Sequence, residues 1–132
     1  MQFTQDELDV LIKNPKPLNL AGFDLSKADL TGADLSGAYL NAAKLRYAEL
    51  SKANLSDTNL SGANLHGAVL LEADLSDADL DLTDLSAAKL GGANMLYAIL
   101  NGTNFKAASY NSETKWPDGF DPVVAGAIKV NF

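Results

Sequence analysis

The chain has 132 residues, no cysteine and a formal net charge of −7, and 47% of its residues are hydrophobic. This length corresponds to one domain, and the acidic balance argues against direct nucleic-acid binding, which needs a basic surface. Without cysteine there is no disulfide, and no apolar run approaches the length of a membrane span. We therefore expect a single domain with neither nucleic acid nor a membrane as its partner.

Residues 3–13 have the pattern of a short helix. Thr4 can cap its first turn, and Glu7 three residues later completes a capping box. The apolar stripe of this helix consists of Leu8, Leu11 and Ile12. We expect the helix to cover one end of the domain, with a partner-binding helix as the alternative. Pro15-Lys16-Pro17 then forms a stiff connector.

The first ten residues contain three acidic residues and no basic one, which is not the pattern of a secretory signal. We therefore expect a cytoplasmic protein, unless a separately cleaved leader has been removed.

From Leu20 to Tyr110 a large side chain occupies every fifth position. These residues are the leucines from Leu20 to Leu90 at intervals of five, followed by Met95, Leu100, Phe105 and Tyr110. From Leu30 onward, a small residue stands two positions before each, in most cases alanine and otherwise threonine, as at Thr58, Thr83 and Thr103. A helix buries one face every 3.6 residues and a strand every 2.0, so neither would bury this series together. A solenoid would, if each pentapeptide forms one short side and the coils stack about 4.8 Å apart.

The repeating unit also carries a resemblance to a known family. Ala-Asp-Leu-Ser-Gly at 33–37, together with Ala-Asn-Leu-Ser-Asp and Ala-Asp-Leu-Ser-Asp further along, resembles the A-(D/N)-L-x-x unit of the pentapeptide repeat family. The resemblance implies an all-β solenoid, a right-handed quadrilateral β-helix with four pentapeptides and twenty residues per coil. It implies that the leucine and the preceding small residue point inward, and it implies no catalytic activity.

This resemblance divides the chain into three parts. We expect an N-terminal capping helix and linker at 1–17, a β-helix of about 4.8 coils at 18–112, and a C-terminal cap at 113–132. In the cap, Trp116-Pro117-Asp118-Gly119 has the composition of a turn, and Asp121 followed by Pro122 can start a helical turn. The run from Thr114 to Pro122 resembles the ending of many cyanobacterial members, which favours a photosynthetic bacterial source.

Twenty residues per coil allow the outward residues to be sorted by face. The fourth face, which carries Leu35, Leu55, Leu75 and Met95, has four acids and no base: Asp34, Asp57, Asp74 and Asp77. The second face gathers bases instead, against the two acids Asp24 and Asp84: Lys27, Lys44, Arg46 and Lys106. Along the fourth face, Asp34, Asn54, Asp74 and Asn94 would stack, which separates like charges. The four acids are our candidate protein-binding face, and the alternative is a merely soluble surface.

Outward apolar residues are few, and three of them, Leu96, Tyr97 and Ile99, fall in the last coil. We expect the C-terminal segment to cover them, with a dimer contact as the alternative. Because both ends have candidate lids and no long edge is left for pairing, we expect a monomer.

The sequence predicts no catalytic, cofactor-binding or metal-binding residue. His66 is the only histidine, and serines such as Ser61 and Ser86 should lie on an open wall without an activating base. Asp77, Asp79 and Asp81 imitate the start of a calcium loop, but Leu82 stands where the required glycine should be.

We therefore expect a non-catalytic, rigid structural or protein–protein interaction module with an unidentified protein partner. The alternative is an acidic DNA mimic that binds a type II topoisomerase such as gyrase, as the family resemblance implies for some members. The chain departs from that group because it is short, lacks a long C-terminal dimerisation segment and has a basic second face.

Overall fold

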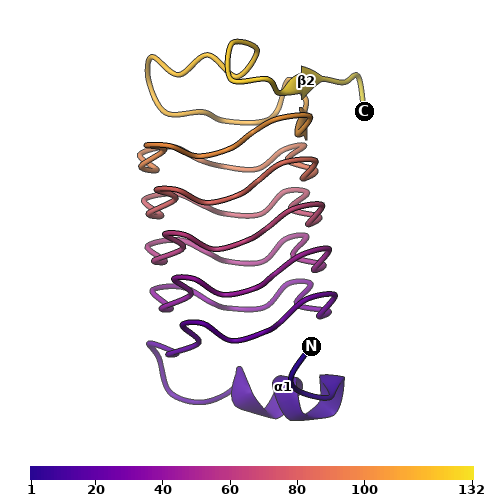
Figure 1. Cartoon of the computed structure of the whole chain (residues 1–132), viewed down its shortest axis with the longest axis vertical. Helices are drawn as coiled ribbons and strands as arrows, with labels where there is room; N and C mark the ends of the chain where they lie inside the picture. The colour runs from indigo at the N-terminus through magenta and orange to yellow at the C-terminus, as the bar shows by residue number, and fades with distance from the viewer.

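The computed structural model describes all of residues 1–132, which coil into a solenoid closed by a helix at one end and a short tail at the other (Figure 1). Successive coils are joined by parallel bridges between residues twenty positions apart, beginning with Asn19↔Tyr39 and Asp24↔Lys44. Bridges recur every five residues, so each coil of twenty residues has four sides. The regular elements are α1 (Gln5–Leu11), β1 (Ser109–Tyr110) and β2 (Ile128–Lys129).

Each pentapeptide satisfies its backbone through the neighbouring coil and through its own corner. In the unit that begins at Leu45, the N–H of Leu45 donates to the carbonyl of Asn64 at 2.7 Å, and the N–H of Tyr47 donates to His66 at 2.9 Å. The N–H of Ala48 donates back to the carbonyl of Leu45 at 3.1 Å and closes the corner. The second corner residue has a positive φ, 56° at Tyr47. A left-handed corner every five residues bends the extended chain, so that each pentapeptide forms one side of the coil.

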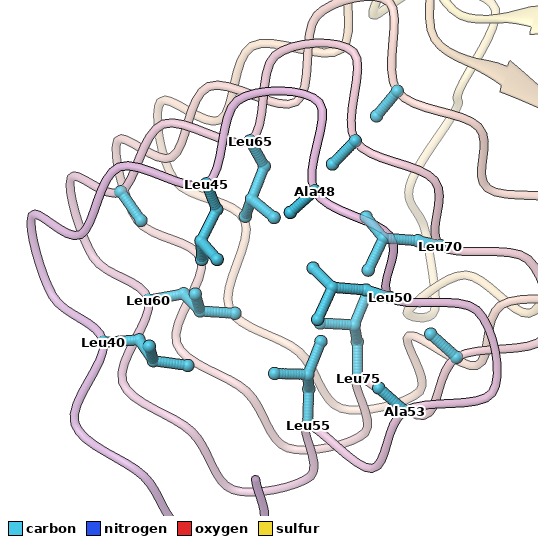
Figure 2. Close-up of a cluster of buried hydrophobic side chains, with 14 of the residues drawn as sticks. Leu40, Leu45, Ala48, Leu50, Ala53, Leu55, Leu60, Leu65, Leu70 and Leu75 are labelled. Atoms are coloured by element: carbon cyan, nitrogen blue, oxygen red, sulfur yellow. The ribbon is translucent and has the colours of Figure 1, made fainter. Parts of the chain in front are cut away.

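The core is a column of leucines with alanines between them (Figure 2). Leu45, Leu50, Leu65 and Leu70 all point into the same interior and are at most 1% exposed. The inward register predicted from the five-residue period is therefore confirmed along the column. Burying a leucine contributes roughly 1.5–3 kcal/mol, so this column is the main source of stability.

Threonine takes the small inward position at a few sides, and its hydroxyl finds a backbone partner there. Thr58 Oγ1 donates to the carbonyl of Leu55 and Thr83 Oγ1 to that of Leu60, both at 2.7 Å. These bonds remove the cost of burying an unpaired hydroxyl.

Helix α1 lies across the first coil. The capping box is confirmed: Glu7 N–H donates to Thr4 Oγ1 at 3.1 Å, and Thr4 N–H donates to Glu7 Oε1 at 2.9 Å. The hydrogen bond that the Thr4 N–H donates to the Glu7 carboxylate lowers the pKa of that carboxyl. The helix is shorter than the expected 3–13 because it ends at Leu11 with Ile12 as its C-cap. Leu8 is fully buried against the core.

The open edge of the first coil receives hydrogen bonds from the N-terminal segment. The Gln5 side chain donates to the carbonyl of Asp29 at 2.8 Å and accepts from the Asp29 N–H at 3.0 Å. Gln2 uses its backbone and its side chain in the same way on Asp24, each at 2.8 Å. The two glutamines thus make the hydrogen bonds to the open edge that a further coil would otherwise make.

At the other end, the coil pairing runs one side beyond the expected boundary at residue 112. The last bridge, Asn94↔Lys115, spans twenty-one residues instead of twenty, because residues 111–113 form a corner with one extra residue. Thr114 is buried in the small inward position, and its hydroxyl donates to the carbonyl of Leu90 at 2.9 Å. Trp116 therefore continues the inward series instead of standing in a turn.

An aromatic cluster closes the C-terminal end. The Trp116 ring packs within 5.1–5.5 Å of three other ring centroids, those of Phe105, Tyr110 and Phe120. Asp121 Oδ1 accepts from the N–H groups of Val123 and Val124 at 3.0 and 3.3 Å, which confirms the turn expected there. Strand β2 then pairs in parallel with β1 on the outer coil.

Candidate functional site

The acidic fourth face is built on a column of parallel bridges. Asp34 pairs with Asn54, Asn54 with Asp74, and Asp74 with Asn94. The predicted alternation of aspartate and asparagine is therefore confirmed as a stack of neighbours. It places two coils, or about 9.6 Å, between one carboxylate and the next, which weakens their mutual repulsion.

Asp34 and Asp74 each use one carboxylate oxygen to hold the following corner. Asp34 Oδ1 accepts from the backbone N–H and the hydroxyl of Ser36 at 3.1 and 2.7 Å. Asp74 Oδ1 accepts from the same two groups of Ser76 at 2.9 and 2.6 Å. Hydrogen bonds from Ser36, followed by the charge of Lys16, lower the pKa of the Asp34 carboxyl. This turn explains the Asp/Asn preference before the inward leucine.

Asp57 and Asp77 belong to the neighbouring corner column and have no such bond. Both are exposed, and their side chains take part in no hydrogen bond or ion pair of the structure. Their backbones have φ values of 58° and 59°, and the Asp57 N–H donates to the carbonyl of Ser76 at 3.0 Å. The corner thus fixes the backbone that carries two carboxylates, which the fold does not otherwise use.

The expectation that the fourth face carries no base needs correction at its two ends. Lys16, from the connector after α1, lies 4.0 Å from Asp34 Oδ2, and Lys115 follows Asn94 in the same column. The sequence period could not reveal either residue, because Lys16 precedes the repeats and Lys115 follows the corner with the extra residue. Asp57, Asp74 and Asp77 remain the acidic middle of the face.

The second face forms a connected surface of side chains around His66. The Arg46 guanidinium lies 5.6 Å from the Tyr47 ring centroid, and the Tyr47 ring meets the His66 ring edge-on at 5.4 Å. His66 Nδ1 lies 2.7 Å from Ser86 Oγ, which in turn donates to Asp84 Oδ1 at 2.5 Å.

The contact between His66 and Ser86 differs from the sequence prediction, which places the serine on an open wall without an activating base. A nucleophilic serine must donate its proton to the histidine. Here Ser86 Oγ donates to Asp84, so its lone pair faces His66. Ser86 thus connects His66 and Asp84 in a network of surface side chains.

The expected cover over the apolar residues of the last coil is wrong. Tyr97 is 74% exposed and Ile99 is 49% exposed, because the C-terminal tail follows β1 on another wall.

No group of three or more His, Asp or Glu side chains is placed to hold a metal ion. In the sequence that imitates a calcium loop, Asp79 Oδ1 accepts from the Asp81 N–H and Asp81 Oδ1 from the Asn101 N–H, each at 3.0 Å. No helix of the chain has the length and apolar character needed to cross a bilayer.

These features define a solenoid of five-residue units with a filled interior and chemically distinct walls. The family model described as pentapeptide repeats matches eight copies, at residues 18–46, 48–86 and 83–109. The chain therefore belongs to the pentapeptide repeat family.

Solved structures of other members are similar to this chain. A pentapeptide repeat protein from the thylakoid lumen of Arabidopsis thaliana is 27% identical with a TM-score of 0.60, over 85% of this chain and 73% of its own. Rfr23 from the cyanobacterium Cyanothece is 36% identical with a TM-score of 0.51, over 79% and 67%. HetL from Nostoc, involved in the regulation of heterocyst differentiation, is 27% identical with a TM-score of 0.53, over 89% and 57%. The comparison with curated proteins found no match.

Proposed function

We propose that this chain is a non-catalytic protein–protein interaction module whose fourth face binds a partner with a basic surface. The observation that carries the proposal is the pair Asp57 and Asp77. Both carboxylates are exposed, stand on consecutive coils and have no partner within the chain. Asp74 lies in the column beside them, and its bond to Ser76 leaves the second oxygen free.

Rigidity and net charge both support this role. The corners are held by backbone hydrogen bonds on both sides, so binding would cost little conformational entropy of the wall. A net charge of −7 attracts a basic partner at long range and accelerates encounter. Because the carboxylates are exposed, ions screen them beyond about 8 Å at physiological ionic strength, and the complex should weaken with salt.

The experiment is affinity capture with the full chain as bait, beside a bait carrying Asp57→Asn and Asp77→Asn. The substitutions preserve side-chain shape and remove two charges, and the melting temperature verifies that the fold is unchanged. The proposal expects a basic protein that binds the native bait, elutes with rising salt and is reduced on the variant bait. Equal capture by both baits would contradict it.

The setting of the protein is part of the same proposal. We place it in a photosynthetic bacterium, in the cytoplasm, as a monomer with a right-handed quadrilateral β-helix of about 4.8 coils. Similar proteins from Cyanothece and Nostoc support the source, and family membership supports the handedness. The involvement of HetL in the regulation of differentiation supports a regulatory setting for the interaction.

A mimic of duplex DNA that binds gyrase is the second candidate, and the acidic column is the observation in its favour. Two coils, about 9.6 Å, separate Asp34 from Asp74, whereas duplex DNA carries a phosphate every 3.4 Å along each strand. Lys16 and Lys115 further reduce the negative charge at the two ends. A supercoiling assay with micromolar protein separates the two functions, since only the mimic inhibits gyrase.

A further inference from the structure

A groove of about 600 Å³ lies on the outside of the solenoid, at the corner between the third and fourth faces near the C-terminal end. Leu71 and Glu72 form one side of it, Gly91 and Gly92 lie in the middle, and Glu113 and Phe132 form the other side. The volume falls within the range of sites that hold a side chain or a small ligand. The outer wall is thus hollowed beside the acidic fourth face.

Two consecutive glycines among the lining residues let neighbouring side chains pack close to the backbone of this groove. Gly92 has a φ of +69°, and a backbone in this left-handed conformation favours glycine. Gly91 has no such requirement, because its φ is outside the left-handed region. A Cβ on Gly91 would instead meet Asn111 Nδ2 at 3.0 Å and Leu71 Cδ2 at 3.3 Å. The Asn111 and Leu71 side chains can therefore pack this closely over the backbone only because residue 91 is a glycine.

The C-terminal tail is tied to the same corner. Asn111 Oδ1 accepts from the Gly92 N–H at 3.0 Å, and Asn111 Nδ2 donates to the carbonyl of Phe132 at 3.2 Å. The Val130 N–H donates to the carbonyl of Tyr110 at 2.8 Å and continues the pairing of β2, beyond which the chain end extends (Figure 1). Phe132 is held at the groove while its side chain is 91% exposed, so an aromatic ring is available to a ligand.

The charges at the corner side of the groove are negative. A Cβ on Gly92 would lie 3.2 Å from Glu72 Cγ, so the Glu72 side chain packs over the glycine, in the groove that Glu113 also lines. Glu113 takes part in no ion pair. Glu72 has one, to Lys52 at 3.9 Å, and both side chains are largely exposed, so that pair is weak. Lys89 is the one base that lines the groove, and it lies on the flat wall before the corner.

We infer that this groove holds an arginine side chain of the partner protein and anchors it beside the fourth face. The guanidinium would lie between Glu72 and Glu113 and against the Phe132 ring, while its methylene stem packs on Leu71. Arginine is the cation that best combines paired carboxylates with an aromatic face. The inference rests on the proposed function, because it supplies an anchor for the same basic partner.

The test is an NMR titration of the ¹⁵N-labelled full chain with Nα-acetyl-arginine amide. We expect amide shifts centred on Gly91 and Gly92. Glu72→Gln with Glu113→Gln should weaken binding by about tenfold, because each exposed ion pair contributes up to about fivefold. Lys89→Met should strengthen binding, since it removes the competing cation.

Asp57→Asn with Asp77→Asn is the matched control, which removes the same charge from the fourth face. Equal loss of binding in both double variants, or shifts confined to the fourth face, would overturn the groove as the anchor and leave the proposed function standing. The absence of saturable shifts, or preferred binding of Nα-acetyl-glutamate amide through Lys89, would also overturn it. Partner capture that depends on Asp57 and Asp77 is a separate readout, so the two failures are distinguishable.

Discussion

Replacing Leu65 by alanine should destabilise the protein strongly. Leu65 is fully buried, its neighbours on the adjacent coils are Leu45 and Leu85, and all three are at most 1% exposed. The substitution removes about three methylene equivalents, which contribute about 0.8 kcal/mol each, or about 2.4 kcal/mol in total. The column is held by backbone bonds on both sides and can collapse little, so a cavity term raises the loss to about 3–5 kcal/mol.

Urea unfolding followed by circular dichroism measures this loss of free energy. The matched control is Leu82→Ala, the same chemical change at a leucine that is 73% exposed on the outside of a corner. It should change the free energy of unfolding by less than about 0.5 kcal/mol. Similar losses at Leu65 and Leu82 would refute the inward register on which the sorting of faces depends.

Three further predictions concern the repeat and its corners. Deletion of residues 46–65 removes one coil, restores every outer column and should leave a folded protein, whereas deletion of two residues should abolish folding; circular dichroism distinguishes them. Ala87→Gly should raise the melting temperature, because Ala87 has a φ of 57° and glycine removes the strain of a left-handed backbone, which costs up to about 1 kcal/mol. A lower melting temperature would contradict the presence of strain at this corner. The pKa of Asp34 is lowered in the fold, so its stabilising contribution is present above about pH 4 and lost on acidification. Asp34→Asn keeps the corner acceptor, so its melting temperature should fall less than that of the native chain between about pH 7 and pH 3, and an equal fall would refute this.

The repeat could be predicted because each buried position recurs at one fixed interval. The inward series needs no knowledge of distant contacts, since a leucine every fifth residue has only one arrangement that buries all of them. Once the coil length is known, the column from Asp34 to Asn94 follows by counting. The capping box of α1 was equally accessible, because Thr4 and Glu7 interact within one turn.

Two kinds of feature could not be predicted from the five-residue interval. One lies where that interval changes, and the other depends on contacts between exposed side chains. The extra residue in 111–113 shifts Trp116 inward and brings Lys115 onto the acidic face. The contact of His66 with Ser86 depends on the rotamers of exposed side chains one coil apart. The structural use of Asp34 could have been recognised, since an aspartate two positions before a serine is the signature of a side-chain turn.

The proposed role depends on the fourth face, and charge reversal there is its most direct test. Lysine already occupies the left-handed corner position at Lys27 and Lys52, so Asp57→Lys with Asp77→Lys should preserve the fold. With the captured partner in hand, isothermal titration calorimetry should show binding weakened by more than about tenfold, with a shallower salt dependence and an unchanged melting temperature. The control reverses two bases on the second face, Lys44→Glu with Arg46→Glu, and should bind as the native chain does. Loss of binding in the control, with binding retained by the fourth-face variant, would contradict the account and assign the function to the basic face.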